Sequence, residues 1–221
     1  MEPVLLVPIF LSFFVPLFSI PAWIKRARKI GLVGNDMNKL HAEEVAEAGG
    51  IAVLIGFIFG ILSYIAIKTF YFKSSKNLIE IFALISVMLI IAFIGFVDDI
   101  LGWKIGLNRR TRLLFLFLAS IPLIVINAGQ SKMMGIEFGL LYPLFFIPLG
   151  IIGASTTFNF IAGYNGLETS QGIIILFALS IVTYFTDSRW LSLISLVTVS
   201  YTHLRAHETS LHLVCRLLLE K

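Results

Sequence analysis

The sequence is poor in charge and almost free of cysteine. Asp, Glu, Lys and Arg together make up 14% of its 221 residues, whereas a soluble domain carries about 25%. One Cys cannot form a disulfide within the chain, which excludes a disulfide-stabilised scaffold. Neither a Gly-X-Y repeat nor a heptad repeat is present, which excludes collagen and a coiled coil. Because 58% of the residues are hydrophobic, a soluble globule and a disordered chain are excluded too, and a polytopic membrane protein remains.

Long apolar runs recur along the chain, separated by polar breaks. A helix needs about 20 apolar residues to cross about 30 Å of hydrocarbon. We therefore expect an all-α fold, a polytopic helical membrane protein with about seven spans in one transmembrane domain, residues 1–199. The expected spans are 3–24, 49–71, 78–97, 113–128, 140–158 and 172–185, with a seventh that begins at Trp190.

The basic residues predict the orientation of these spans. The first span has its basic residues after its apolar stretch and not before it, so we do not interpret it as a cleaved signal peptide. Cytoplasmic loops are enriched in Lys and Arg, which predicts an integral membrane protein with its N-terminus outside. The nine basic residues then expected inside are Lys25, Arg26, Arg28, Lys29, Lys39, Lys104, Arg109, Arg110 and Arg112, and the five outside are Lys68, Lys73, Lys76, Lys132 and Arg189.

The last 22 residues, 200–221, differ in composition from the rest of the chain. They contain three of the four His residues and the only Cys. Their sequence resembles the conceptual translation of adapter-type DNA, so we expect a non-native tail that follows a truncated transmembrane domain. His203, Arg205 and His207 are then not interpreted as a binding site.

Three polar segments are expected on the cytoplasmic face. Residues 31–50, 95–112 and 159–172 supply carboxylates, carboxamides, cations and glycines. Oxygen ligands from Asp, Asn or Glu suit Mg²⁺, and Lys or Arg can neutralise phosphoryl oxygens. A Walker loop, a Rossmann glycine pattern, a zinc spacing and a serine elbow are absent from the sequence. The segments therefore predict a site for a diphosphate and its metal.

Asp98 and Asp99 end an otherwise uncharged apolar run. Ionisable groups at membrane depth are costly to desolvate and are functional by default, and carboxylates at a helix carboxyl end oppose the macrodipole. The alternative is a helix-terminating turn in which these carboxylates bond nearby backbone N–H groups. Asn159 and Asn165 have an alternative as well, as interhelical hydrogen-bonding groups.

Four segments resemble the polyprenyl-phosphate N-acetylhexosamine-1-phosphate transferases. They are GNDMNK (34–39), AEAGG (46–50), GFVDD (95–99) and NFIAGYNGLETSQG (159–172). Within that superfamily, AGYNGLE is most similar to the branch of the dolichyl-phosphate N-acetylglucosaminephosphotransferases, whereas the bacterial cell-wall branch resembles N-x-x-D-G-x-D here. The resemblance covers about residues 3–199.

The resemblance implies a helical membrane enzyme of about ten spans. Such an enzyme transfers GlcNAc-1-phosphate from UDP-GlcNAc to a polyprenyl (dolichyl) phosphate with Mg²⁺ and releases UMP. The resemblance implies catalytic roles for Asp98, Asp99 and Lys39, and a magnesium ligand in Asn159. The implied substrate-binding residues are Asp36, Glu47, Arg112, Asn165, Gly166, Leu167 and Glu168.

The resemblance also implies what else the reaction needs. Arg112 stands where the family usually has a pyrophosphate-binding Lys, which keeps the charge and changes the geometry. A second acidic metal ligand and a sugar-recognition loop should lie beyond the residues present, so we expect this chain to be inactive. The expected partners are the two substrates and the membrane, with a homodimer as a further expectation and no nucleic acid.

Three other functions remain open at this point. A bacterial-type enzyme that uses undecaprenyl phosphate differs mainly in its lipid. A membrane transporter would show broken helices in corresponding positions of two halves, and the sequence has no internal repeat. A non-catalytic scaffold would leave the polar residues at membrane depth without a role.

Overall fold

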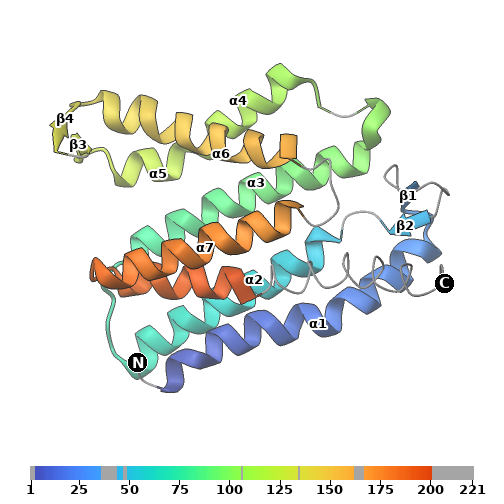
Figure 1. Cartoon of the computed structure of the whole chain (residues 1–221), viewed down its shortest axis with the longest axis horizontal. Coiled ribbons are helices and arrows are strands. Elements are labelled where there is room, and N and C mark those ends of the chain that lie inside the picture. Colours follow the sequence, from blue (N-terminus) through green and yellow to red (C-terminus); the bar gives the residue numbers. More distant parts are fainter. Residues whose placement is uncertain are drawn as a thin grey trace, which may run out of the picture. The chain divides into compact units, whose positions relative to one another are not determined.

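The computed structural model describes residues 3–35, 44–46, 49–105, 107–133, 135–161 and 167–200, most of which are helical (Figure 1). The chain forms two compact units. The first combines the residues before 76 with those from 161 onward, and the second is residues 76–160. Long apolar helices occur in both units, so the predicted helical membrane protein is confirmed.

The first unit is built around two packed helices, α1 and α2. A short antiparallel ribbon, in which Val33 lies opposite Ala46, stands between them in the sequence. In order, the described elements are a 3-10 turn (Pro3–Leu5), α1 (Leu6–Lys29), β1 (Val33–Asn35), β2 (Glu44–Ala46), α2 (Gly50–Ala66), a π-helical turn (Ile67–Tyr71), α7 (Leu167–Phe185) and a helix over Arg189–Ser200.

Glycine allows α1 and α2 to pack closely. A Cβ on Gly60 would lie 2.8 Å from the Cβ of Ser12, and a Cβ on Gly56 would overlap the ring of Pro16. The two glycines form a GxxxG, a spacing that brings helix backbones together in membranes. Their place in α2 is therefore explained by packing.

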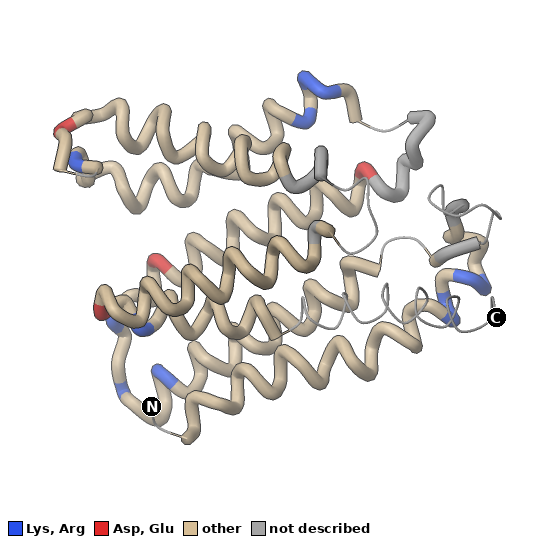
Figure 2. Tube along the Cα trace, in the orientation of Figure 1, with Lys and Arg blue, Asp and Glu red and all other residues tan. Residues whose placement is uncertain are grey.

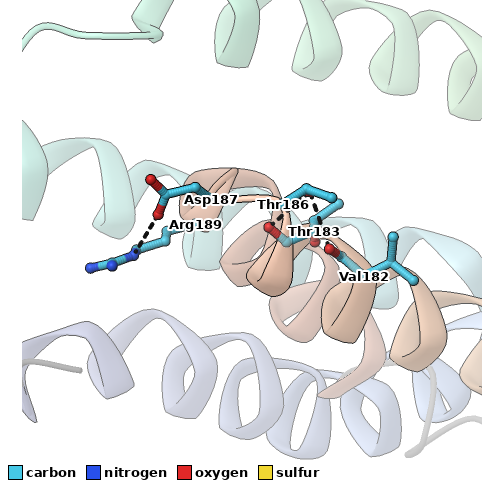
Figure 3. A network of polar contacts seen from close by, with 5 residues as sticks. All are labelled: Val182, Thr183, Thr186, Asp187 and Arg189. Atoms are coloured by element: carbon cyan, nitrogen blue, oxygen red, sulfur yellow. Dashed lines mark hydrogen bonds and ion pairs between the residues drawn. The ribbon is translucent and has the colours of Figure 1, made fainter.

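The helix over Arg189–Ser200 folds back against α7 through a short turn. Ser192 Oγ donates to the carbonyl of Ser180 (2.9 Å), so a buried hydroxyl is satisfied between the two helices. Within the turn, Thr186 Oγ1 donates to the Val182 carbonyl (3.1 Å), and Asp187 has a φ of 61°. Asp187 also pairs with Arg189 at 3.3 Å, as the dashed line in Figure 3 shows.

The second unit contains three successive helical segments, α3, then α4 with α5, then a π-helical turn with α6, and a small ribbon lies between the second and the third. α3 packs against α4 and α5. Lys132 and Glu137 lie opposite each other in the ribbon and form an ion pair of 2.8 Å. The elements are α3 (Leu78–Ile105), α4 (Arg109–Ala119), α5 (Ile121–Ile126), β3 (Lys132–Met133), β4 (Ile136–Glu137), a π-helical turn (Tyr142–Phe146) and α6 (Ile147–Ile161).

Within the described residues, three helical stretches are long and apolar enough to cross a membrane: Pro3–Lys29, Gly50–Tyr71 and Leu78–Asp98. They match three predicted spans. The predicted span over 113–128 corresponds to the end of α4 and to α5, with a break in the helix at a turn at Ser120. Pro122 explains the break, since it has no N–H to donate to the carbonyl of Leu118 and its ring crowds that carbonyl. Shorter apolar helices at Tyr142–Thr157, Thr169–Phe185 and Arg189–Ser200 occupy the remaining predicted positions.

Candidate active site

The predicted acidic pair lies within α3 and not at its end. α3 continues to Ile105, seven residues beyond Asp98. The pair is therefore not at a helix carboxyl end, although the stretch that is apolar enough to cross a membrane does end at Asp98. Asp98 is about two turns from the carboxyl end, where the macrodipole has little effect. The unfavourable interaction with the macrodipole that is expected for carboxylates at a helix carboxyl end is therefore small for Asp98.

Asp98 connects α3 to the start of α4 through both carboxylate oxygens. The Leu107 N–H donates to Asp98 Oδ1 at 2.8 Å, and Arg112 Nη2 lies 3.3 Å from Asp98 Oδ2. The Asp98 side chain is 22% exposed and the Arg112 side chain 32% exposed. Both therefore remain accessible while they hold the bend between the two helices. The helix-terminating turn that the sequence left open is not formed at Asp98, because α3 continues to Ile105; Asp98 does accept a backbone N–H, that of Leu107, which lies beyond this helix.

The start of α4 concentrates positive charge. Arg109 and Arg110 are exposed in its first turn, and Arg112 follows them in the same turn, as the basic positions in Figure 2 show. The amino end of a helix carries about half a positive charge from its aligned peptide dipoles, so these cations and the dipole repel one another. Asn108 caps the helix without a side-chain hydrogen bond. The Asp98 carboxylate offsets part of this repulsion, because a negative charge near a helix amino end is favourable.

This arrangement suits a multiply charged anion. The Arg112 guanidinium has five N–H donors in a fixed planar fork, and its contact with Asp98 occupies one of its two terminal nitrogens. The remaining donors, with the exposed Arg109 and Arg110 beside them, are available to phosphoryl oxygens. The described site can therefore bind phosphate groups and hold their charge.

The other predicted residues in the second unit are placed only along the backbone. Asp99 lies in α3, next to Asp98, and Asn159 lies in the last turns of α6. The side chains of both lie outside the described residues. The structure therefore brings Asp98 and Arg112 together, and it tests no contact of the predicted magnesium ligand.

Three described segments are adjacent in sequence to the predicted residues of the first unit. Strands β1 and β2 flank residues 36–43, and α7 begins at Leu167, which is 38% exposed. In Figure 1 the start of α7 lies toward the end of this unit that holds the ribbon. Glu168 belongs to the first turn of α7, although its side chain is outside the described part. The predicted residues Asp36, Lys39, Glu47, Asn165 and Gly166 lie outside the described residues.

The residue that sequence reasoning missed is Leu107, which acts through its backbone N–H. An apolar side chain gives no signal that its amide will bond a carboxylate nine residues earlier. For metals, the described residues contain no cluster of three or more His, Cys, Asp or Glu side chains. The oxygen donors of Asp98 are nevertheless of the kind that Mg²⁺ prefers.

Comparison with known families gives one clear match. The pattern of glycosyl transferase family 4 matches residues 81–204, a segment that includes both Asp98 and Arg112. This segment is more than half of the chain.

Individual proteins from archaea, eukaryotes and bacteria are also similar. A protein of Saccharolobus solfataricus is 35% identical over 183 residues, which is 80% of this chain and 54% of that protein. It is provisionally named a UDP-N-acetylglucosamine–dolichyl-phosphate N-acetylglucosaminephosphotransferase. A Dictyostelium discoideum protein with that name is 26% identical over 71% of this chain and 42% of its own length. A phospho-N-acetylmuramoyl-pentapeptide-transferase of Wolbachia pipientis is 28% identical over 81% of this chain and 58% of its own length. The chain thus spans about half the length of the curated relatives it matches.

Proposed function

Because the chain belongs to glycosyl transferase family 4, we propose that it is part of an enzyme that transfers GlcNAc-1-phosphate from UDP-GlcNAc to a dolichyl-type polyprenyl phosphate. The observation that carries this proposal is the Asp98–Arg112 pair at the cationic start of α4, inside the matched segment. Two archaeal relatives with the dolichyl-type name, at 35% and 30% identity, favour this branch over the bacterial relative at 28%, while the eukaryotic relative with that name is 26% identical.

In the proposed reaction, a phosphate oxygen of the lipid attacks the β-phosphorus of UDP-GlcNAc. A new P–O bond forms, the bond from the β-phosphorus to the bridging oxygen breaks, and UMP leaves with that oxygen. Catalysis of phosphoryl transfer depends mainly on positioning and on neutralising charge. A phosphate monoester has a second pKa near 6 and is mostly dianionic at pH 7, so the nucleophile needs little help from a base.

The roles of the described residues follow from this. Arg112 neutralises charge on the diphosphate and on the leaving phosphate. Asp98 fixes Arg112 and the bend before α4, through contacts of 3.3 Å and 2.8 Å, and it is available to accept a residual proton from the lipid phosphate. We assign Asp99 to the same acidic pair, and Lys39, Asp36, Glu47, Asn165, Gly166, Leu167 and Glu168 to the substrate-binding segments of the first unit.

We also propose Mg²⁺ as the cofactor. Asn159 carries a carboxamide oxygen of the kind that this ion accepts, so it would be a ligand, while Asp98 and Asp99 remain the catalytic acidic pair. When bound, Mg²⁺ would neutralise charge on the diphosphate. The chain's own residues would then orient the two phosphates for attack. We place these segments on the cytoplasmic side and the N-terminus outside, because Lys and Arg are in excess on that side of the spans.

The test is a transfer assay with membranes that contain the full-length gene product. Radiolabelled UDP-GlcNAc is supplied with dolichyl phosphate, and lipid-extractable label is counted. We expect labelled lipid with dolichyl phosphate and much less with undecaprenyl phosphate. A preference for undecaprenyl phosphate and UDP-N-acetylmuramoyl-pentapeptide would favour the bacterial-type reaction instead. Absence of label with every acceptor would contradict the proposal.

A further inference from the structure

Helix α1 has one face that packs and one face that does not. Pro8, Ser12 and Pro16 are buried on the packed side, where α1 meets α2. On the other side Phe10 and Phe18 are 57% and 74% exposed. Their rings stack with Phe14 between them, at centroid distances of 6.3 Å and 6.5 Å. In a membrane protein such an exposed aromatic stripe is a lipid-facing surface.

The basic end of α1 lies on this same lipid-facing side. Successive residues of an α-helix are turned by about 100°. Counted from Phe10, the stripe to Phe18 covers an arc of about 80°, and Lys25, Arg28 and Lys29 fall at about 60°, 0° and 100°. Arg26 falls at about 160°, outside the stripe. Lys25 and Arg28 fall within the arc of the stripe and Lys29 falls about 20° beyond it, so these three lie toward the lipid-facing side of the helix.

These charges begin where the hydrocarbon should end. Leu6, the first residue of α1, is 44% exposed, and Lys25 follows it by 19 residues. At 1.5 Å per residue this separation is about 29 Å, which matches the hydrocarbon thickness of about 30 Å. Lys25, Arg28 and Lys29 therefore reach the level of the lipid headgroups.

The cations at this level are accessible. Lys25, Arg28 and Lys29 are all exposed. Among the described residues, none of the three has a carboxylate within the 4.0 Å that defines an ion pair, whereas Arg112, Lys132 and Arg189 each have one. A helix carboxyl end also favours cations, but that effect does not depend on which side of the helix they occupy. The placement of three of the four basic residues toward the lipid-facing side is what a lipid partner explains.

We infer that Lys25, Arg28 and Lys29 form a binding surface for the headgroups of anionic phospholipids at the end of α1. The aromatic stripe packs against the acyl chains. The three cations bind the phosphate and any other acidic group that the lipid headgroup carries. Basic residues beside a membrane end are each expected to strengthen such binding about fivefold. The inference uses no residue of the candidate active site, so it stands or falls independently of the proposed enzyme activity.

The experiment measures lipid binding to the purified full chain in detergent by native mass spectrometry. Phosphatidylglycerol and phosphatidylcholine are added separately, because they differ in headgroup charge. We expect the chain to retain phosphatidylglycerol at least tenfold more strongly, and we expect the difference to shrink in high salt, because salt screens exposed charges. Equal retention of the two lipids would overturn the inference.

Two matched pairs of variants separate this surface from general charge. Lys25→Gln with Lys29→Gln is compared with Lys73→Gln with Lys76→Gln, which removes two exposed lysines elsewhere. The first variant should lose most of the preference for phosphatidylglycerol, and the second should keep it. An equal loss in both would show an effect of net charge alone and would overturn the inference.

Arg28→Gln and Arg26→Gln form the second pair. Both are exposed arginines in the last turn of α1, and they differ mainly in the side of the helix that they occupy. Arg28→Gln should weaken phosphatidylglycerol retention several-fold, and Arg26→Gln should change it less than twofold. Equal effects of the two variants would contradict the assignment to the lipid-facing side. Elution volume in gel filtration checks that each variant is folded.

Discussion

Asp98 accepts a hydrogen bond from the Leu107 N–H and forms an ion pair with Arg112, and two substitutions distinguish the contributions of these contacts. Asparagine at this position keeps an oxygen that can accept the Leu107 N–H bond but loses the ion pair with Arg112. Because both side chains are partly exposed, Asp98→Asn should lower the free energy of unfolding by only about 1 kcal/mol. Asp98→Ala loses both contacts and should cost about 1 kcal/mol more.

Thermal unfolding in detergent measures both variants, with Asp187→Asn as the control. That variant removes one partner of a pair whose side chains are 78% and 86% exposed, so it should change stability by less than about 0.5 kcal/mol. If Asp98→Ala were as stable as Asp98→Asn, the Leu107 bond would not stabilise the bend.

Arg112 is expected to act through the geometry of its guanidinium as well as its charge. In the full-length gene product, Arg112→Gln should lower the rate of GlcNAc-1-phosphate transfer by about 100-fold, because a donor that holds transition-state charge is lost. Arg112→Lys should fall between that variant and the parent, since lysine keeps the charge but not the planar fork.

The same transfer assay measures a control variant and the energetic coupling between Asp98 and Arg112. Lys132→Gln also removes a cation from an ion pair of the second unit, in the ribbon, and should leave the rate unchanged. If Asp98 acts by orienting Arg112, the double variant Asp98→Asn with Arg112→Gln should be hardly slower than Arg112→Gln alone. Fully additive losses would assign Asp98 a separate role.

At the scale of elements, α1 and α2 approach closely where two glycines of α2 face α1. Gly56→Ala would place a methyl group into the rigid ring of Pro16, so we expect a loss of about 2 kcal/mol in the free energy of unfolding. Gly153→Ala is the matched control, because a Cβ there meets nothing within 4 Å and α6 should gain about 0.5–1 kcal/mol in helix propensity.

Unfolding of the two glycine variants in detergent, followed by circular dichroism, provides the measurement. The two substitutions are chemically identical, so opposite signs would locate the effect in the contact with α1. A destabilisation of similar size in both variants would show that the Pro16 contact is not responsible.

The sequence predicted elements best where a single physical term dominates. The apolar runs that became α1, α2 and α3 are long enough that burial in lipid alone specifies a helix. The ends and breaks of helices were harder to predict, because several physical effects compete at those positions. Asp98 does end the stretch that is long and apolar enough to cross a membrane, Leu78–Asp98, but the helix itself extends to Ile105, because a helix needs only its backbone hydrogen bonds to continue. Within the expected fourth span, a turn at Ser120 separates α4 from α5, because Pro122 has no N–H to complete the helix hydrogen bonds there.

The candidate site was predictable in its residue types but only partly in its contacts. The sequence indicated Asp98 and Arg112 as members of one site, and the structure places them 3.3 Å apart. It gave no indication of the Leu107 amide, because a backbone donor is common to nearly every residue. The strands β1 and β2 were not predicted either, since three-residue strands are too short to show an alternating pattern.

At the scale of the whole molecule, the proposed reaction should depend on a small divalent cation. Diphosphate and lipid phosphate are both anionic, and the cationic start of α4 has part of its charge offset by Asp98, so further positive charge is needed between the substrates. Removing metal from the full-length gene product with EDTA should therefore abolish transfer. Mg²⁺ should restore the rate and Ca²⁺ should restore little of it, because Ca²⁺ is larger and prefers six to eight oxygen ligands at longer distances.

Two measurements distinguish the role of the metal in transfer from a role in folding. The transfer assay reports activity after EDTA and after each added ion, and the thermal unfolding temperature is followed in the same samples. An unchanged unfolding temperature with lost transfer is the expected result, because the described contacts that hold the bend before α4 are a hydrogen bond and an ion pair between residues of the chain. Transfer that survives EDTA would refute the metal assignment. A large fall in the unfolding temperature would show that the ion stabilises the fold and is not needed for the reaction alone.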